Sequence, residues 1–499
     1  MVNITDIFII GGGINGCGIA ADAAGRGLSV VLAEQNDLAS GTSSASTKLI
    51  HGGLRYLEYY EFSLVRKALS EREVLLNSAP HIITPMRFLL PHHKGLRPAW
   101  LIRLGLFFYD HLGGRKLLPP TSTVNIDDGI YKNILNPEFK KAFEYSDCWV
   151  DDARLVVLNA IAARDKGATI LTRQKCVSAK REDGYWTIKV RSINSGEETI
   201  FKSKVLINAA GPWVDDVISN TLHRGEKKLM RLVKGSHIIV RKLFDHDRAY
   251  LFQGVDGRII FAIPYENDFT VIGTTDQDFE GDLSEVEISE DEISYLCQMA
   301  SEYFNKEVKQ SQVLHHYAGV RPLYDDGATQ AQEATRDFVL KLDGDNALLN
   351  IIGGKITTYR VLAEECLNKI EQYFPNMHEE WTGSSTLPGG DFSVKEYDFY
   401  LDKLSNEYAF LDQALLGRLF ANYGTNAWNV LKGVSNISDM GRNFGSGLYE
   451  KEAAYLIENE WAETAEDILW RRTKLGLHMN KDQIGAFVHW VAVDYPNKY

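Results

Sequence analysis

The N-terminal segment 6–34 constrains the fold more than any other part of the chain. An apolar run leads into Gly11-x-Gly13-x-x-Gly16, a helical stretch of small residues follows, and a second apolar run ends at Glu34. Strand, glycine turn, helix and strand in this order form a βαβ unit, and the N–H groups at the start of such a helix bind a pyrophosphate. The segment therefore predicts a parallel sheet that binds a dinucleotide, and a glycine-rich turn without a nucleotide is the alternative.

The residues of this motif each have a physical reason. Gly11 permits the tight turn, Gly13 lets the backbone approach the phosphates, and Gly16 lets the helix pack closely on the strand. Glu34 lies 18 residues after Gly16, where a carboxylate accepts hydrogen bonds from the ribose hydroxyls. Because an acid at this position disfavours a 2′-phosphate, NADP is not expected.

Length and composition indicate an ordinary globular protein. The chain has 499 residues, enough for two or three domains, of which 44% are hydrophobic and 24% charged. A net charge of −13 argues against a broad nucleic-acid surface, so no nucleic-acid partner is expected. The five cysteines form no CxxC pair, which predicts no metal site and a reducing, cytoplasmic compartment. The first strand follows Met1 almost directly and no apolar run could cross a bilayer, so neither a leader nor a spanning helix is expected.

Local patterns further along the chain predict the remaining architecture. Segments 167–182 and 185–192 are typical of strands joined by an Asp-Gly turn, and 230–318 alternates like an antiparallel sheet. Segment 347–367 repeats the order strand, glycine turn, helix. Beyond a Pro-Gly-Gly linker at 388–390 the periodicity is helical, as in 451–477.

Nucleotide-like segments recur near 1–60, 167–213 and 347–367, whereas an NAD dehydrogenase usually has one compact nucleotide domain. This dispersal favours FAD, bound in an extended form. The predicted fold class is α/β, with a discontinuous Rossmann-like FAD-binding domain, an inserted antiparallel β-sheet substrate domain and a C-terminal α-helical domain. The expected boundaries are 1–85, 150–229 and 319–387 for the FAD domain, 86–149 and 230–318 for the substrate-binding cap, and 391–499 for the helical domain.

Six motifs in order carry a family resemblance: GGGINGCGIAADAAGRGLSV, TSSASTKLIHGGLRYLE, INAAGPW, GVRPLYDD, GGKITTYR and AEDILWRRTKLGL. Together they resemble the FAD-dependent glycerol-3-phosphate dehydrogenases of bacterial respiratory chains, within the D-amino-acid-oxidase-like flavoproteins. The resemblance implies non-covalent FAD, oxidation of sn-glycerol 3-phosphate to dihydroxyacetone phosphate, and transfer of electrons to a membrane quinone. It also implies a homodimer attached peripherally to the inner face of the cytoplasmic membrane. The calcium loop of mitochondrial relatives, DxDxDG, does not occur here.

A phosphate dianion that carries a secondary alcohol needs fixed cations. Arg55 after the HGG turn, Arg321 in GVRPL and Lys355 in GGK supply them, because arginine binds phosphate oxygens bidentately and lysine adds a point charge. Tyr56 could donate a further hydroxyl bond. A surface salt bridge is the alternative for each cation.

Removal of the hydroxyl proton needs a base. His51 is the first candidate because a neutral imidazole accepts a proton near pH 7, and His237 is the second; a structural role is the alternative for both. Lys355 and the helix that begins after it are expected to stabilise negative charge on the reduced flavin. Arg321 completes the catalytic set.

Cofactor contacts are expected from the glycine motif, the TSSASTK loop and the turns that follow later strands. For the serines a helix cap is the alternative. The expected cofactor residues are Gly11, Gly13, Ile14, Asn15, Gly16, Glu34, Ser43, Ser44, Lys48, Gly52, Val177, Gly211, Trp213, Gly353, Gly354, Lys355, Thr357 and Thr358.

Segment 87–116 combines six Arg or Lys residues with Trp100 and several aliphatic and phenylalanine side chains. On one helix, this combination suits shallow insertion among anionic lipid headgroups, and a buried core helix is the alternative. Three other functions stay open: an oxygen-dependent glycerophosphate oxidase, an amine or hydroxyacid oxidase of the same superfamily, and a non-catalytic flavin-binding protein.

Overall fold

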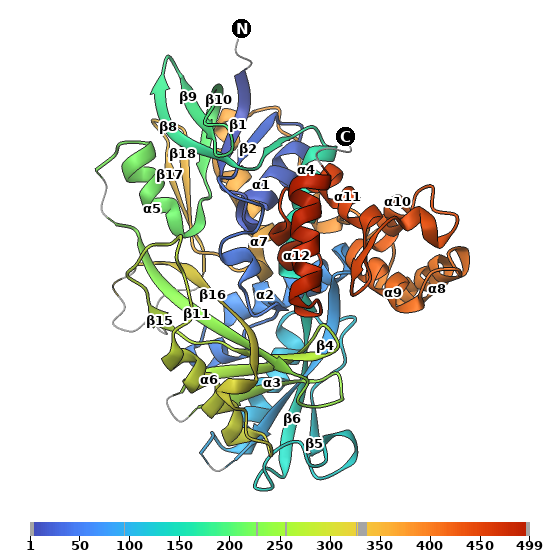
Figure 1. Cartoon of the computed structure of the whole chain (residues 1–499). Coiled ribbons are helices and arrows are strands. Elements are labelled where there is room, and N and C mark those ends of the chain that lie inside the picture. The colour runs from blue at the N-terminus through green and yellow to red at the C-terminus, as the bar shows by residue number, and fades with distance from the viewer. Residues whose placement is uncertain are drawn as a thin grey trace.

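The computed structural model describes residues 4–93, 95–225, 228–254, 257–325, 327 and 337–495. Lys94 of the predicted lipid-contacting segment and Asp326 of the GVRPLYDD motif lie outside these ranges. Two β-sheets occupy the two ends of the molecule, and the C-terminal helices form a lobe at one side (Figure 1).

The first sheet has the strand order β17-β18-β10-β1-β2-β7, in which β18, β10, β1, β2 and β7 run parallel. β17 joins the edge antiparallel, and the hairpin β8-β9 pairs with the first half of β10. The strands are β1 (Ile4–Ile10), β2 (Val30–Ala33), β7 (Thr169–Leu171), β8 (Gln174–Glu182), β9 (Tyr185–Ser192), β10 (Glu198–Asn208), β17 (Val339–Asp343) and β18 (Leu348–Ile352).

Both faces of the parallel strands are covered, which explains their continuous apolar runs. Successive residues of β1 point to opposite faces: Ile7 and Ile9 pack with the core of α1, α4 and α7, whereas Phe8 and Ile10 pack with the core that includes Trp186 of the hairpin. The predicted Asp-Gly turn of that hairpin is confirmed, with φ angles of 51° and 81° at its two residues.

The second sheet has the order β15-β11-β14-β13-β12-β4-β6-β3, with β16 paired to β11 and β5 to β6. It is antiparallel except where β12 meets β4. α6 packs on one face and α2 with α3 on the other. The strands are β3 (Leu49–Ile50), β4 (Ile83–His92), β5 (Ser122–Asn125), β6 (Lys141–Val150), β11 (Met230–Arg241), β12 (Ala249–Gln253), β13 (Ile259–Tyr265), β14 (Phe269–Gly273), β15 (Gln277–Asp278) and β16 (Val313–Tyr324).

Two expectations about this sheet need correction. Strand β16 continues to Tyr324, past the expected boundary at 318, because residues 319–324 keep pairing with β11. Segment 87–116 is not one helix, since β4 runs to His92 beside β6 and the helix α3 begins only at Ala99, after Pro98. Main-chain pairing between distant strands, which no local pattern reveals, produces both differences.

The C-terminal lobe is helical as predicted, with one small hairpin, β19 (Asn443–Gly445) and β20 (Leu448–Tyr449). The expected helix over 451–477 is interrupted: α11 ends at Asn459, Trp461 has a φ of 56°, and a π-helical turn spans Asp467–Arg472. The α-helices within the described residues are α1 (Ile14–Gly25), α2 (Phe62–Ser78), α3 (Ala99–Leu112), α4 (Asp152–Asp165), α5 (Val214–Asp216), α6 (Glu290–Tyr303), α7 (Tyr359–Ile370), α8 (Tyr397–Glu407), α9 (Gln413–Tyr423), α10 (Ala427–Val430), α11 (Glu450–Asn459) and α12 (Lys481–His489).

Candidate active site

A cavity of about 400 Å³ lies at the carboxyl ends of β1, β2, β10 and β18 and extends to the second sheet. In the first sheet β1 lies between β2 and β10. Strands β2 and β7, which follow β1, lie on one side of it, and β18 and β17, which follow β10, lie on the other side, so the strand order reverses between β1 and β10. Ligands of open α/β sheets bind at such a switch point. The predicted site residues that line the cavity are Gly11, Gly13, Ile14, Asn15, Glu34, Ser43, His51, Arg55, Tyr56, Gly211, Trp213, Arg321, Gly353, Gly354, Lys355 and Thr357.

The glycine motif has the shape of a phosphate cradle. Gly11 has a φ of 111°, and a Cβ there would lie 2.5 Å from the Ala209 carbonyl oxygen. A Cβ at Gly16 would lie 1.9 Å from the Gly11 oxygen, so this glycine serves packing rather than the cavity wall. The Ile14 N–H donates to Ser43 Oγ at 3.0 Å, which joins the TSSASTK loop to the start of α1.

Two backbone N–H groups hold the Glu34 side chain at the end of β2. Its Oε2 accepts from the Gly12 N–H at 2.7 Å and its Oε1 from the Asn36 N–H at 2.8 Å. Burial raises the pKa of Glu34, and the two backbone donors oppose that rise. The carboxylate therefore has a fixed orientation toward the cavity.

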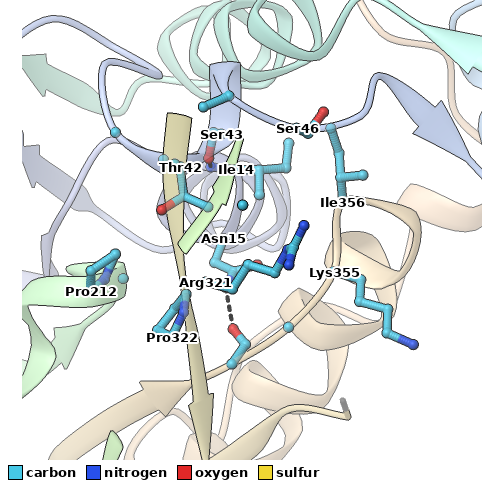
Figure 2. A pocket seen from close by; sticks show the side chains of 18 of the residues that line it. Ile14, Asn15, Thr42, Ser43, Ser46, Pro212, Arg321, Pro322, Lys355 and Ile356 are labelled. Carbon is cyan, nitrogen blue, oxygen red and sulfur yellow. Dashed lines mark hydrogen bonds between the residues drawn. The ribbon is translucent and has the colours of Figure 1, made fainter. Parts of the chain in front are cut away.

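Asn15 connects the two glycine turns. Its Nδ2 donates to the Gly353 carbonyl oxygen at 3.1 Å, the dashed contact in Figure 2. Its Oδ1 is buried with no hydrogen-bond partner among the described residues. Gly353 and Gly354 have φ angles of 77° and 97°, which let the backbone after β18 turn along the cavity. A ligand donor would satisfy the Asn15 oxygen, so cradle, acid and amide together fit an extended dinucleotide.

The predicted substrate cations line the same cavity as His51. The Lys355 ammonium lies 3.8 Å from the centre of the Tyr56 ring. The Arg321 guanidinium donates to Thr274 Oγ1 at 2.9 Å and forms an ion pair with Asp276. Figure 2 shows that Arg321 comes from β16 and Lys355 from the turn after β18.

The second sheet contributes lining residues that no sequence motif indicated. Asp276 and Thr274 follow β14 and orient Arg321. Gly235 of β11 makes room for that arginine, because a Cβ there would lie 2.4 Å from Nη2. A glycine inside a strand signals such a close approach, and this was the available clue. Arg258, directly before β13, is a further lining cation.

The two candidate bases differ in position. His51 lines the cavity, and its backbone N–H donates to Thr357 Oγ1 at 3.3 Å. His237 is buried behind the wall, with Nε2 at 3.0 Å from Thr47 Oγ1 and its ring stacked on Tyr317. Burial holds the pKa of His237 well below its usual value. His237 is therefore neutral, and the hydroxyl of Thr47, which lines the cavity, lies between its ring and the cavity.

Lys48 requires a correction. Its ammonium is buried and lies 2.8 and 3.0 Å from the Asp152 carboxylate oxygens, so it neutralises that carboxylate instead of reaching the cavity. Thr358 is the N-cap residue of α7, and Gly52 donates to the Tyr109 hydroxyl. The predicted cofactor residues that do not line the cavity are Gly16, Ser44, Lys48, Gly52, Val177 and Thr358.

Helix α3 exposes several large apolar side chains to solvent. Leu106 and Tyr109 are buried, whereas Trp100 is 69% exposed and Phe107 55% exposed. Trp100 and Phe107, with the exposed Leu104 and Phe108 of the same helix, are called the aromatic face. Tyr60 and Phe62, where the chain enters α2, are also exposed. Arg97 pairs with Glu58 at 3.2 Å. Within the described ranges, no helix has the length and apolar character needed to cross a membrane.

The fold and the cavity together define a flavin-dependent oxidoreductase. Residues 6–360 match the family model described as FAD dependent oxidoreductase, and residues 381–492 match the C-terminal domain of alpha-glycerophosphate oxidase. The chain therefore belongs to the FAD-dependent oxidoreductase family. The predictions of FAD as cofactor and of a Rossmann-like fold with a helical C-terminal domain are confirmed.

Two relatives and one solved structure are similar to this chain over almost its full length. The chain is 52% identical over 487 residues to D-erythritol 1-phosphate dehydrogenase of Brucella abortus, covering 97% of each chain. It is 49% identical over 501 residues to glycerol-3-phosphate dehydrogenase of Pseudomonas aeruginosa, covering 100% of this chain and 97% of the relative. The structure of glycerol-3-phosphate dehydrogenase from Bacillus halodurans, complexed with FAD, superposes with a TM-score of 0.79 at 28% identity, covering 99% and 91% of the two chains. The resemblance drawn from the six motifs is thereby confirmed.

Proposed function

We propose that this protein oxidises sn-glycerol 3-phosphate to dihydroxyacetone phosphate and passes the electrons to a membrane quinone. The observation that carries the proposal is the meeting of Arg55, Arg321, Lys355 and His51 in one cavity, beside a cradle that fits FAD. The relatives named for glycerol 3-phosphate support the choice of substrate.

The charged side chains and the base have defined roles in this proposal. Arg55 and Arg321 bind the phosphate oxygens, and Asp276 with Thr274 fixes the direction of the Arg321 guanidinium. The secondary alcohol loses its proton to His51. The chemistry that bound FAD would supply is hydride acceptance from the carbon that bears this hydroxyl. Lys355 supplies positive charge beside the reacting group, and the first turn after it adds backbone N–H donors.

D-Erythritol 1-phosphate is the second candidate substrate. A relative named for its oxidation is 52% identical over almost the full length of both chains. The two substrates share a phosphate and a secondary alcohol, so the same cations and base serve both. They differ in chain length, which the cavity wall beyond the phosphate must accommodate.

The aromatic face supports the proposed acceptor and location. Exposed tryptophan and phenylalanine side chains on α3 suit shallow insertion into a lipid surface, where a quinone is dissolved. We infer a cytoplasmic protein, acting as a homodimer, attached peripherally to the inner face of the membrane. An oxygen-dependent oxidase would have the same substrate site, so only the choice of acceptor separates the two.

Anaerobic titration of the purified yellow protein tests the substrate. We expect glycerol 3-phosphate to bleach the flavin absorbance. The rate of bleaching by D-erythritol 1-phosphate is measured in the same way and compared with it. Absence of bleaching by both compounds would refute the proposed function. Comparison of oxygen with a soluble quinone analogue then tests the acceptor, and faster turnover with oxygen would favour the oxidase.

A further inference from the structure

The loop over residues 34–48, called here the cofactor loop, connects β2 to β3 and supplies most of one wall of the cavity. Apart from a short 3-10 turn, Thr42–Ser44, it has no regular structure that would fix its shape. Ala39 and Lys48 have φ angles of 62° and 58°, in the left-handed region that side chains disfavour. Contacts from outside the loop must therefore hold it.

The adenosine end of the loop is held by the C-terminal lobe. The buried Asp37 carboxylate accepts from Arg471 Nε at 2.6 Å and from Arg472 Nη1 and Nη2 at 2.7 and 2.8 Å. Arg173 binds Asp467 of the same π-helical turn, and its backbone N–H donates to the Asn36 carbonyl oxygen at 3.0 Å. The residues next to Glu34 are thus fixed from the lobe.

The flavin end of the loop is held by the same segment. Lys474 forms a buried ion pair with Asp151, the N-cap of α4. The neighbouring Asp152 accepts from Lys48 Nζ and, at 2.7 Å, from Ser46 Oγ. Lys474 itself has a φ of 56° and is 4% exposed, so its conformation is also imposed by this contact.

We propose that segment 471–474 of the C-terminal lobe positions the cofactor loop, so that the lobe retains FAD without lining its cavity. Arg472 acts on the adenosine end through Asp37, and Lys474 acts on the flavin end through Asp151 and Asp152. Buried charges favour this role because movement of the loop would separate Asp37 from Arg472 and Lys48 from Asp152. Each separation would leave an uncompensated charge in the interior. The inference concerns FAD retention and does not depend on the substrate or the electron acceptor.

The matched control is another ion pair of the same kind between lobe and FAD domain. Arg154 of α4 binds Glu460 bidentately, and both side chains are 1% exposed. Within the described residues, neither side chain bonds to the cofactor loop or to Asp151 and Asp152, which connect Lys474 to that loop. Glu460→Gln keeps the Glu460 backbone carbonyl, which accepts from Arg472 at 2.7 Å. It therefore weakens docking of the lobe while leaving the contacts to Asp37 in place.

The experiment measures the rate of FAD release from each holoprotein, as the rise of flavin fluorescence after dilution, together with the thermal unfolding midpoint. We expect Asp37→Asn, Arg472→Gln and Lys474→Met to release FAD about tenfold faster or more, with a changed visible flavin spectrum. Glu460→Gln should release FAD within about twofold of the wild-type rate at a comparable loss of thermal stability.

Two outcomes would overturn the proposal. One is wild-type release rates in all three folded variants. The other is equal acceleration in Glu460→Gln, which would mean that release follows weakened docking in general. Arg472→Lys, which keeps the charge and loses the bidentate fork, serves if the glutamine variant does not fold, and should show an intermediate rate.

Discussion

At the scale of single residues, Lys355 gives the sharpest test of the substrate site. Its ammonium lies over the Tyr56 ring inside the cavity. We expect Lys355→Ala to weaken binding of the polyol phosphate about 10- to 100-fold, since a hydrogen bond to a charged group contributes about 1.5–3 kcal/mol. The flavin midpoint potential should also fall, because a nearby cation stabilises the anionic reduced form.

Stopped-flow flavin reduction at a series of substrate concentrations measures the first effect, and spectral redox titration the second. Lys369→Ala, an exposed lysine at the end of α7, is the control. An unchanged dissociation constant would remove Lys355 from the substrate site, and an unchanged potential would remove its effect on the flavin.

The two candidate bases differ in whether they line the cavity: His51 does and His237 does not. We expect His51→Asn to lower the rate of anaerobic flavin reduction by about 10²–10⁴-fold and to abolish its decline toward acidic pH, because the base acts only when neutral. His237→Asn should have a smaller effect, since its ring meets the cavity only through Thr47. If both variants keep the wild-type rate and pH profile, neither histidine is the base.

At the scale of elements, sequence patterns predicted what is encoded locally. The β1-α1-β2 unit, the β8-β9 hairpin and the return to strand, glycine turn and helix at β18-α7 all follow from apolar periodicity and turn residues. The pairing of β16 with β11 up to Tyr324, and of β4 with β6, depends on strands far apart in sequence. Neither could be inferred from either partner alone.

The same distinction between local patterns and long-range pairing explains which site residues could be predicted. Arg321 and Lys355 could be predicted because glycine motifs flank them, whereas Asp276 reaches Arg321 only through the pairing of β11 with β16 and β15. Lys48 lies in a motif, but its ammonium binds Asp152, and no sequence pattern associates these two residues. Motif membership indicated proximity to the cofactor and left side-chain direction undetermined.

Helix α3 allows a test of the aromatic face. We expect the double variant Trp100→Ser, Phe107→Ser to lose about tenfold or more in affinity for anionic liposomes, because each inserted side chain contributes about 1.5–3 kcal/mol when fully withdrawn from water. Co-sedimentation measures the bound fraction. Phe399→Ser, a 65% exposed phenylalanine on α8 of the C-terminal lobe, is the control. Equal binding by the double variant and wild type would exclude α3 as the anchor.

At the scale of the whole molecule, the C-terminal lobe is joined to the FAD domain by buried charged groups rather than by apolar packing alone. Arg472 with Asp37, Arg154 with Glu460 and Lys474 with Asp151 all cross this boundary. Such pairs cost desolvation and repay it only in one geometry, so they favour a single docked arrangement. The cofactor loop lies at this boundary, which links docking of the lobe to the shape of the FAD site.

His81 lies at the same boundary, and we expect it to make the stability of the protein sensitive to acid. It is buried against Gly389, Gly424 and Phe392, and burial, followed by the charge of Arg154, lowers its pKa to about 3. The unfolded chain binds a proton near pH 6.5, so between these values the unfolded state holds more protons and the free energy of unfolding falls as pH decreases.

Replacement of His81 should therefore flatten the pH dependence of stability. Between pH 7 and pH 5 we expect wild type to lose about 2 kcal/mol more unfolding free energy than His81→Leu, since only the histidine gains a proton on unfolding in that interval. Urea titrations followed by tryptophan fluorescence at the two pH values measure the difference. His378→Leu, at an exposed position, should keep the wild-type dependence. If His81→Leu loses as much stability as wild type, the buried imidazole is not the group that makes this boundary acid-sensitive, and the charged pairs around it must be tested instead.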